Sequence, residues 1–570
     1  MQSTSTGRTR RRRQVGAPDY GSSSDRSRTN DLKIVSNVEN EEIIIEGTTP
    51  RGTTTGEDTR GRRVFKQRTT RSTVQRDDIS SAAADFAKYL PLLDDDIVEV
   101  ECKFGLGKST GFTTRVSTSI LPGSEDDLLV EQIRDYIWNQ SSSRSVRYSG
   151  NRVYSKTTEK FKEYSSGQFM AKVTAAHEED VTGISPEQVV RNATLIREKT
   201  RYSKKYRGTV LSVTYVTTTR INVRGGNPNT TEIEVEALPG TTMSQFMAVV
   251  IEVAARLDEW MTAMEVYRSA MEPDSTKPAI YTRFRGSMPL AFRPSYSLED
   301  YSVKNKMDGE RVNVIAVDGK VYLLTRSDGL MFTDIVVVDD GRYVADAEWI
   351  DAYLINDDGT VDLLDTKHIV AFDMMYSPDL QSMLNLPYSD RYDRLREWVQ
   401  SVQVEGTEIV LSEVMNPVDT VIDRDDTGRT VWIHDGVKYY TDGLILQSYS
   451  SPYVTGTDTS QYKWKEDANI TVDFRAKMTD STVELYIAIP GDSSGNREIM
   501  ATTTTLESME QQYDGQICEF SYDSQSGNWR FERVRSDKSS PNFITVAFDN
   551  MEAALSSLTE EEMLELLHSY

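Results

Sequence analysis

The chain has 570 residues, of which 38% are hydrophobic and 27% are charged, and this length predicts about three or four soluble, globular domains. Its net charge of −24 argues against a protein that coats nucleic acid, though not against an enzyme that takes an RNA end into a basic pocket. No apolar run approaches the roughly 18 residues that a membrane helix needs. The N-terminus has no apolar signal-peptide core, so we expect neither secretion nor membrane binding.

Cysteine and histidine usage points to an intracellular protein without a histidine-based metal site. Cys102 and Cys518 are far apart and lack metal-ligand spacing, and the four histidines are scattered. A reduced compartment is the simple interpretation of such cysteines.

Residues 1–80 are rich in Ser, Thr, Arg and Gly and poor in large apolar residues, which predicts a disordered basic tail. The tail contains the cluster Arg10–Arg13. This cluster fits a targeting signal or an RNA-binding or partner-binding arm, and it equally fits a solvated tail.

Residues 81–272 change to short alternating segments with β-branched residues, which predicts an antiparallel sheet or barrel. We expect strands at 96–104, 197–202, 209–220 and 232–237. We also expect a helix at 125–139 and a long amphipathic helix at about 242–271.

Two of these strands carry acids on one face and a third carries cations, because alternate residues of a strand share a face. The acidic faces hold Glu99, Glu101 and Lys103, and Glu232, Glu234 and Glu236; the basic face holds Arg197, Lys199 and Arg201. Neighbouring carboxylates inside a barrel are costly unless a cation neutralises them. Their oxygens suit Mg²⁺ or Mn²⁺. Taken singly, each strand fits the solvent face of an amphipathic strand better, and the combination of two acidic strands with a basic one favours the metal site.

The motifs Glu99-x-Glu101-x-Lys103 and Glu234-x-Glu236 resemble the two glutamate motifs of the triphosphate tunnel metalloenzymes, which include RNA 5′-triphosphatases. The resemblance implies a tunnel of eight strands in which glutamates of both motifs bind the metal. Because Glu232 shares the second strand's face, the ligand pair there is open, and we expect Glu234 and Glu236. The resemblance also implies a set of triphosphate-binding cations, Lys103, Arg197, Lys199 and Arg201.

Lys306-Met307-Asp308-Gly309 opens the chemistry of the next predicted domain, residues 273–470. A lysine that loses its proton beside an acid and a glycine turn can attack the α-phosphate of a nucleotide. Neighbouring cations favour the neutral amine, and together with a metal they stabilise charge on the transferring phosphoryl group. Alone, the four residues prove little, because they fit a solvated turn better than a nucleophile.

Further motifs follow Lys306 in order. They contain Arg311, Glu348, Phe372, Asp442-Gly443, Lys463, Lys465, Arg535, Asp537 and Lys538. Each has an ordinary alternative: Glu348 as a surface acid, Phe372 as core, Asp442-Gly443 as a turn, and both lysines as the wet face of an edge strand. The ordered set is harder to explain in that way.

This set resembles the covalent nucleotidyltransferases and, through Asp442-Gly443-Leu444-Ile445 and Arg535-x-Asp537-Lys538-x-x-Pro541-Asn542, the mRNA capping guanylyltransferases. The resemblance implies that GTP is the substrate and that Lys306 carries GMP. It further implies nucleotide-binding residues, namely Asp308, Arg311, Glu348, Phe372, Asp442, Lys463, Lys465, Arg535, Asp537 and Lys538. Residues 471–550 would form a small OB-fold barrel, and residues 551–570 a C-terminal helix.

The expectation is therefore an α+β multidomain enzyme that removes the γ-phosphate of 5′-triphosphate RNA and transfers GMP to the resulting diphosphate end. It resembles the bifunctional capping enzymes of large DNA viruses and linear plasmids, which implies a host-cytoplasmic or virion location, with the nucleus left open. Expected partners are a separate cap N7-methyltransferase, since no methyltransferase domain is evident, and an RNA polymerase. The alternatives are an ATP-dependent polynucleotide ligase with an accessory polyphosphate-binding tunnel, and a scaffold subunit with decayed sites.

Overall fold

The structure of the chain is a computed structural model. It describes Phe86, Tyr89, Leu93 and residues 98–570, except for gaps at 107–110, 125–126, 141–143, 167–168, 222–228, 339–340, 357, 403–408, 466–469, 492–496, 506–510, 524–525, 537, 539 and 557. The predicted tail at residues 1–80 lies outside the described residues. Among the helices described, none is long and apolar enough to cross a membrane.

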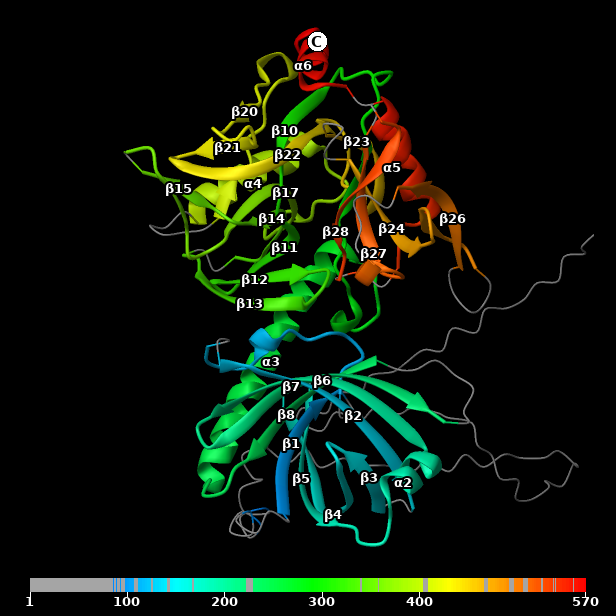
Figure 1. Cartoon of the computed structure of the whole chain (residues 1–570). Helices are drawn as coiled ribbons and strands as arrows, with labels where there is room; N and C mark the ends of the chain where they lie inside the picture. The colour runs from blue at the N-terminus through cyan, green and yellow to red at the C-terminus, as the bar shows by residue number, and fades with distance from the viewer. Residues whose placement is uncertain are drawn as a thin grey trace, which may run out of the picture. The chain divides into compact units, whose positions relative to one another are not determined.

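The first domain is a closed barrel of eight antiparallel strands in the order β1-β5-β4-β3-β2-β6-β7-β8 (Figure 1). Its strands are β1 Val98–Gly105, β2 Leu129–Asn139, β3 Arg144–Ser149, β4 Arg152–Ser166, β5 Phe169–Asp180, β6 Leu195–Tyr206, β7 Thr209–Arg220 and β8 Asn229–Ala237. The short helix α2 Pro186–Asn192 precedes β6. The expected barrel is present in the structure.

The predicted helix at 125–139 is wrong, because β2 occupies Leu129–Asn139. This strand pairs with β6 from Leu129 opposite Ser203 to Ile137 opposite Leu195, and its end pairs with β3. Its apolar residues fit a helical stripe as well as a strand. The β-branched and aromatic residues around Ile137, together with the pairing partners on both sides, decide for the strand.

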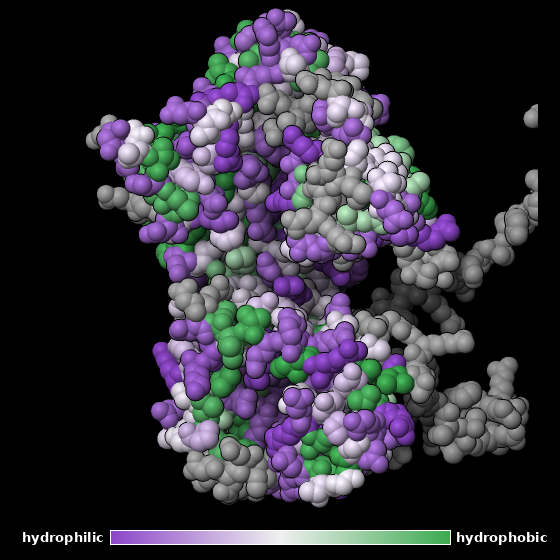
Figure 2. All heavy atoms as spheres, viewed as in Figure 1, coloured by the Kyte–Doolittle hydropathy of each residue, from purple (hydrophilic) through white to green (hydrophobic). Residues whose placement is uncertain are grey.

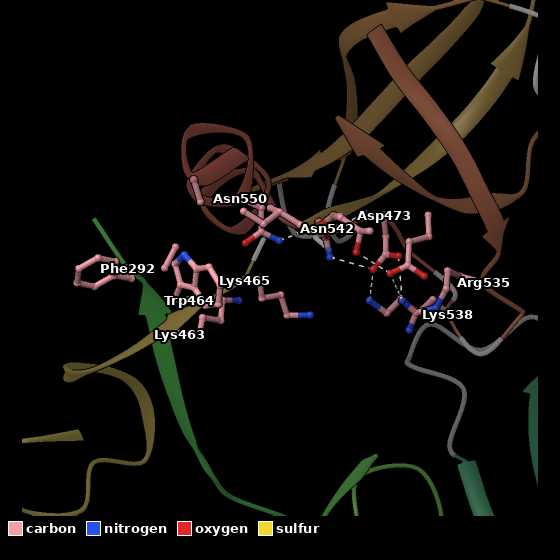
Figure 3. Close-up of a pocket in the computed structure, with 14 residues that line it drawn as sticks. Phe292, Lys463, Trp464, Lys465, Asp473, Arg535, Lys538, Asn542 and Asn550 are labelled. Atoms are coloured by element: carbon pink, nitrogen blue, oxygen red, sulfur yellow. Dashed lines mark hydrogen bonds and ion pairs between the residues drawn. The ribbon is translucent and has the colours of Figure 1, made fainter. Parts of the chain in front are cut away.

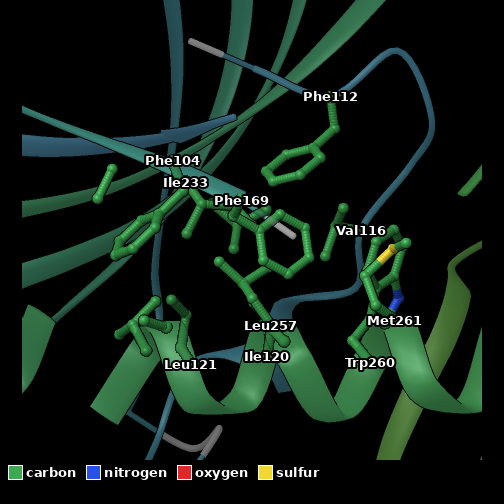
Figure 4. Close-up of a cluster of buried hydrophobic side chains, with 14 of the residues drawn as sticks. Phe104, Phe112, Val116, Ile120, Leu121, Phe169, Ile233, Leu257, Trp260 and Met261 are labelled. Carbon is green, nitrogen blue, oxygen red and sulfur yellow. The ribbon is translucent and has the colours of Figure 1, made fainter. Parts of the chain in front are cut away.

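The long helix α3 Met243–Met271 begins at a capping box in which the Thr242 side chain caps Gln245. It was expected to be amphipathic, yet buried side chains surround most of its circumference. Figure 4 shows Leu257 and Trp260 of this helix facing Phe169 and Ile233 of the barrel. Gln245, Ile251 and Ala255 are exposed on one side, so the helix is buried on most sides but not all round. The same core cluster also includes Ile315, Tyr322 and Val344 of the following domain.

Two sheets form the central domain. One has the order β13-β12-β11-β14-β17-β18 with β19 beside β17, and the other has the order β16-β15-β22-β21-β20 with β10, β23 and β9 joined through β22. The strands are β9 Ser287–Ala291, β10 Tyr301–Met307, β11 Glu310–Val317, β12 Lys320–Thr325, β13 Gly329–Val336, β14 Tyr343–Ile350, β15 Tyr353–Ile355, β16 Val361–Leu363, β17 His368–Ser377, β18 Gln381–Ser382, β19 Ile409–Leu411, β20 Asp423–Arg424, β21 Thr430–His434, β22 Val437–Ser448 and β23 Gly456–Trp464. Helix α4 Tyr388–Val402 packs its apolar side chains into the core of the first sheet.

The C-terminal part is a five-stranded antiparallel sheet in the order β26-β25-β24-β27-β28. It is built from β24 Thr471–Met478, β25 Val483–Ile489, β26 Arg497–Thr504, β27 Ile517–Asp523 and β28 Asn528–Val534. Two helices follow, α5 Ile544–Ser556 and α6 Glu560–His568. The single C-terminal helix expected at 551–570 is therefore wrong, because Thr559 starts a new helix by forming a capping box with Glu562.

The visible surface is mainly hydrophilic, with hydrophobic residues in small groups between polar ones (Figure 2). This matches a chain in which 27% of the residues are charged. Scattered apolar side chains of this kind are normal on a folded surface.

Candidate active site

Lys306 lies near the end of β10, where the pairing with β22 shifts register between Asn305 and Met307. Such an irregularity re-aims a side chain out of the ladder. The Lys306 Nζ donates a hydrogen bond to Oδ1 of Asp442 on β22, at 2.7 Å. The Nζ of Lys465, just after β23, donates to the other oxygen of the same carboxylate. One half-buried acid therefore joins the two predicted lysines.

Two glycines near Asp442 allow close backbone contacts that a side chain would block. A Cβ added to Gly309 would lie 2.7 Å from the carbonyl oxygen of Trp349. A Cβ added to Gly443 would lie 2.0 Å from the carbonyl oxygen of Trp464, and Gly443 has a φ of +141°. Only glycine fits such close approaches. These contacts explain why both motifs contain an Asp-Gly pair.

Charges at this point perturb the neighbouring groups. Burial raises the pKa of Asp442, but the ammonium groups of Lys306 and Lys465 outweigh it and hold that pKa below its usual range. Burial, reinforced by Lys465 and Lys306, lowers the pKa of Lys463 to about 8. Lys306 on β10 and the lysines at the end of β23 therefore flank β22, the strand that carries this carboxylate. This excess of positive charge suits a phosphate.

Glu348 on β14 lies directly opposite Arg311 on β11. Burial raises the pKa of Glu348 to about 7, although Lys306 and Arg311 oppose the shift. Arg311 makes a bidentate pair with Asp346, with 2.9 Å between Nε and Oδ1 and 2.5 Å between Nη2 and Oδ2. Asp346 is fully buried and was not among the predicted site residues, although it lies two residues before Glu348.

Phe372 and Asp308 occupy different settings. Phe372 lies on β17, partly exposed, and its ring centroid is 5.4 Å from the Cζ of Arg311. Asp308 is exposed in the turn after β10, where its backbone N–H donates to the carbonyl of Tyr440. The structure therefore places Phe372 beside the charged cluster, and it gives the Asp308 side chain a solvent-facing position.

The predicted C-terminal motif gathers around Asp473 on β24, a residue that the sequence analysis missed. Arg535 donates to its Oδ1 at 3.0 Å, and Lys538 and Asn542 both donate to its Oδ2. The side-chain oxygen of Asn542 also accepts a hydrogen bond from the backbone N–H of Asp473, at 2.8 Å. The available signal was a lone acid inside an apolar strand. Asp537 lies outside the described residues.

A cavity of about 230 Å³ brings the end of β23 together with this motif (Figure 3). Lys463 and Lys465 line one side, and Asp473, Arg535 and Lys538 line the other. In Figure 3 the ion pairs of Asp473 hold the arginine and lysine at the rim opposite the two lysines. The cavity is therefore lined by cations from the last two motifs of the predicted series.

A second charged site lies on one side of the barrel strands. Register places Glu101 opposite Glu236 and Lys103 opposite Glu234 on β1 and β8. The Lys103 Nζ is 2.5 Å from Oε1 of Glu234 and 3.1 Å from Oε2 of Glu101. Alternate residues of the same strands, such as Cys102 and Val235, are fully buried in the hydrophobic core. The acids therefore share the face away from the core.

Basic side chains of β6 form ion pairs with acidic side chains on other strands. Arg197 contacts Glu232 at 2.5 Å and Arg201 contacts Glu236 at 3.3 Å. Lys199 pairs with Asp135 of β2. The sequence analysis missed three further members of this site, Asp135, Lys156 and Glu178. Lys156 pairs with Glu99 and lies 3.2 Å from Glu178.

Electrostatics show that these acids lie close together. Burial raises the pKa of Glu101, and so do the charges of Glu99 and Glu234, against the opposing Lys103. Burial likewise raises the pKa of Glu236, helped by Glu99 and Glu101. Glu234 behaves oppositely, because Lys103 outweighs burial and lowers its pKa to about 2. Like charges at such range call for a cation.

Metal binding is not evident from side-chain geometry alone. In the part of the chain that the structure describes, no group of three His, Cys, Asp or Glu side chains has positions that could hold a metal ion. Lysines and arginines pair with the expected ligands instead. The donor chemistry, oxygen atoms of clustered carboxylates, still fits a hard divalent cation.

Comparison with known proteins assigns the central and C-terminal parts. Residues 259–467 match the family model "mRNA capping enzyme, catalytic domain", and residues 453–564 match "mRNA capping enzyme, C-terminal domain". Together these segments carry both domains of the mRNA capping enzyme family.

Relatives agree with this assignment. An mRNA-capping enzyme of Caenorhabditis elegans is 24% identical over 47% of this chain and 46% of its own length. The mRNA-capping enzyme subunit alpha of Neurospora crassa is 22% identical over 49% of this chain and 83% of its own length. The chain thus spans about half the length of the nematode relative.

One solved structure also matches part of the chain. The RNA triphosphatase domain of a trifunctional mimivirus mRNA capping enzyme is 11% identical, covering 31% of this chain and 98% of that domain, with a TM-score of 0.24. A TM-score this low makes no case by itself. The role of the barrel is therefore argued from its own side chains.

Proposed function

We propose that this chain performs two consecutive steps of mRNA 5′-capping. The observation that carries the proposal is the cluster in which Asp442 holds Lys306 and Lys465, with Lys463 beside them. An amine nucleophile surrounded by cations is suited to attack a phosphate. The match to the capping-enzyme catalytic domain covers all four residues.

In the first nucleotidyl step, the neutral amine of Lys306 attacks the α-phosphorus of GTP. A nitrogen–phosphorus bond forms, the bond from that phosphorus to the bridging oxygen breaks, and pyrophosphate leaves. Lys463 and Lys465 neutralise the oxygens of the transferring group. Arg535 and Lys538, across the cavity from these lysines, bind the departing phosphates. A terminal oxygen of the RNA diphosphate then attacks the same phosphorus and releases Lys306.

Before this transfer, the barrel removes the γ-phosphate from the 5′-triphosphate end of the RNA. Lys103, Lys156, Arg197, Lys199 and Arg201 supply the positive charge that binds the triphosphate. The carboxylates of Glu99, Glu101, Glu234 and Glu236 would hold Mg²⁺ or Mn²⁺, which supplies Lewis-acid polarisation of the γ-phosphate when bound. The lysines that now neutralise these acids would turn toward the substrate.

The finer expectations extend this proposal. We infer a bifunctional enzyme of viral or plasmid type that works in the host cytoplasm or the virion, with the nucleus left open. Eukaryotic relatives such as the nematode protein do not test that origin. A separate cap N7-methyltransferase and an RNA polymerase are the proposed partners.

Two RNA substrates separate the two activities. With labelled GTP, the wild-type chain should cap both 5′-triphosphate and 5′-diphosphate RNA. Glu101→Gln should cap only the diphosphate RNA, because its tunnel is impaired while Lys306 is untouched. Glu198→Gln is the control: Glu198 lies on β6 between Arg197 and Lys199, and its side chain is exposed. Equal capping of both RNAs by Glu101→Gln contradicts the assignment of the barrel.

A further inference from the structure

Lys304 is a buried lysine two residues before Lys306. It is 2% exposed, and its Nζ has no hydrogen-bond partner within the described part of the chain. An ammonium has three N–H donors and no acceptor. Leaving such donors unpaired in the interior is costly, and native structures seldom do so without a reason.

The charged groups around Lys304 are already committed to other partners. Asp373 accepts both arms of Arg391, at 2.8 and 3.0 Å, and also the backbone N–H of Met374. Asp346 accepts from Arg311 and from the hydroxyl of Tyr453. These acids balance the charge of Lys304 at a distance. They leave its N–H groups free to meet an acceptor from elsewhere.

Two aromatic rings flank the ammonium. Its Nζ lies 4.5 Å from the ring centroid of Tyr388 and 5.4 Å from that of Phe372. Phe372 is one of the expected nucleotide-binding residues, and aromatic rings of this kind stack on nucleotide bases. Lys304 therefore lies beside the ring on which the base would stack. In the nucleotide, the ribose lies between the base and the α-phosphate. In β10, Lys304 lies two residues before Lys306, which is about 6.6 Å along the strand, so one lysine can meet the base while the other meets the α-phosphate.

Guanine and adenine differ in the hydrogen-bonding groups that their edges offer to an ammonium. Guanine presents two acceptors, O6 and N7, whereas adenine replaces O6 with the donor amino group N6. Burial lowers the pKa of Lys304 to about 8, against the opposing charge of Asp373. At pH 7 the side chain therefore remains mostly protonated and donates only.

We propose that Lys304 donates a hydrogen bond to O6 of the guanine base and thereby makes the nucleotide site select GTP over ATP. This inference rests on the proposed guanylyltransferase function, and it adds the residue that sets the base preference. The ammonium supplies an attractive contact to O6 and a repulsive one to the adenine amino group. The missing hydrogen-bond partner of the Lys304 Nζ is then supplied by the guanine base when the nucleotide binds.

The test compares GTP with 2-aminopurine riboside triphosphate, whose base is guanine without O6. Rates of covalent labelling at Lys306 are measured with these two nucleotides and with ATP on the same protein preparation, so that any unfolded fraction cancels in the ratios. We expect the wild type to favour GTP about 10- to 100-fold, the range of a hydrogen bond to a charged group. In Lys304→Met the ratio should fall to within about threefold, because the charged contact is gone.

Control variants keep the result interpretable. Lys477→Met, at an exposed lysine of β24, should keep the wild-type ratio. If Lys304→Met does not fold, Lys304→Gln retains a neutral donor and should give an intermediate ratio.

The outcomes distinguish two failures. An unchanged ratio in Lys304→Met, with GTP labelling intact, overturns the role of Lys304 and leaves the guanylyltransferase function standing. Faster labelling of the wild type by ATP, or no labelling by any nucleotide, overturns both.

Discussion

Replacing Gly443 with alanine should open the joint between β22 and β23 and weaken the nucleotide site. The added Cβ would lie 2.0 Å from the carbonyl oxygen of Trp464, and the φ of +141° is one that other residues rarely adopt. The two strands pair across this point, Leu444 opposite Trp464. They must separate by about 1 Å to relieve the contact, because interiors are close-packed.

The cost has two parts. A side chain forced into a sparsely populated backbone region costs about 1–3 kcal/mol, and overpacking adds about 1–3 kcal/mol. Gly436 provides the matched control: its φ is +78°, and nothing lies within 4 Å of its added Cβ. Gly436→Ala should therefore cost only about 1–2 kcal/mol, the left-handed penalty alone.

Thermal unfolding of both variants measures the difference, at roughly 2–4 °C per kcal/mol for a domain of 150–250 residues. Labelling with GTP should fall in Gly443→Ala, because Lys463 and Lys465 move with β23, and should persist in Gly436→Ala. Equal shifts in melting temperature, or full labelling by a destabilised Gly443→Ala, would refute the argument.

Two further predictions concern single acids. Asp473→Ala should release Arg535 and Lys538 from their shared partner and slow GTP labelling about 10- to 100-fold, measured at saturating metal; unchanged labelling would show that Asp473 is dispensable. Glu348 has a folded pKa of about 7 against 4.5 when unfolded, so the stability it contributes is present below pH 4.5 and is lost as pH rises through 7. Glu348→Gln should therefore gain up to about 3 kcal/mol over wild type at pH 8 and nothing at pH 4.5, as measured by chemical denaturation; a gain independent of pH would contradict this.

The fold was predictable where local pattern and tertiary context agree. Alternation on β1 and β8 placed Glu101 and Glu236 on a common face, and the register confirms that they lie opposite each other. The segment 129–139 was predicted wrongly, since its apolar spacing suits a helix and only its pairing with β6 decides for a strand. Pairing partners far apart in sequence cannot be read from such a segment.

The motif residues of the site could be predicted from the sequence. The residues that pair with them in the structure could not. Lys306, Lys463 and Lys465 were found because each stands in a short ordered pattern. Asp473 organises the C-terminal motif from about 60 residues upstream, and Lys156 reaches Glu99 from β4. Such partners depend on strand register and on how the chain folds back, which one sequence does not reveal.

The most direct test of the account is covalent labelling of the full chain with α-labelled GTP or ATP and a divalent metal, followed by a denaturing gel. The account predicts a GMP adduct on the wild type and none on Lys306→Ala. An adduct that survives in Lys306→Ala, or one formed from ATP in preference to GTP, would contradict it.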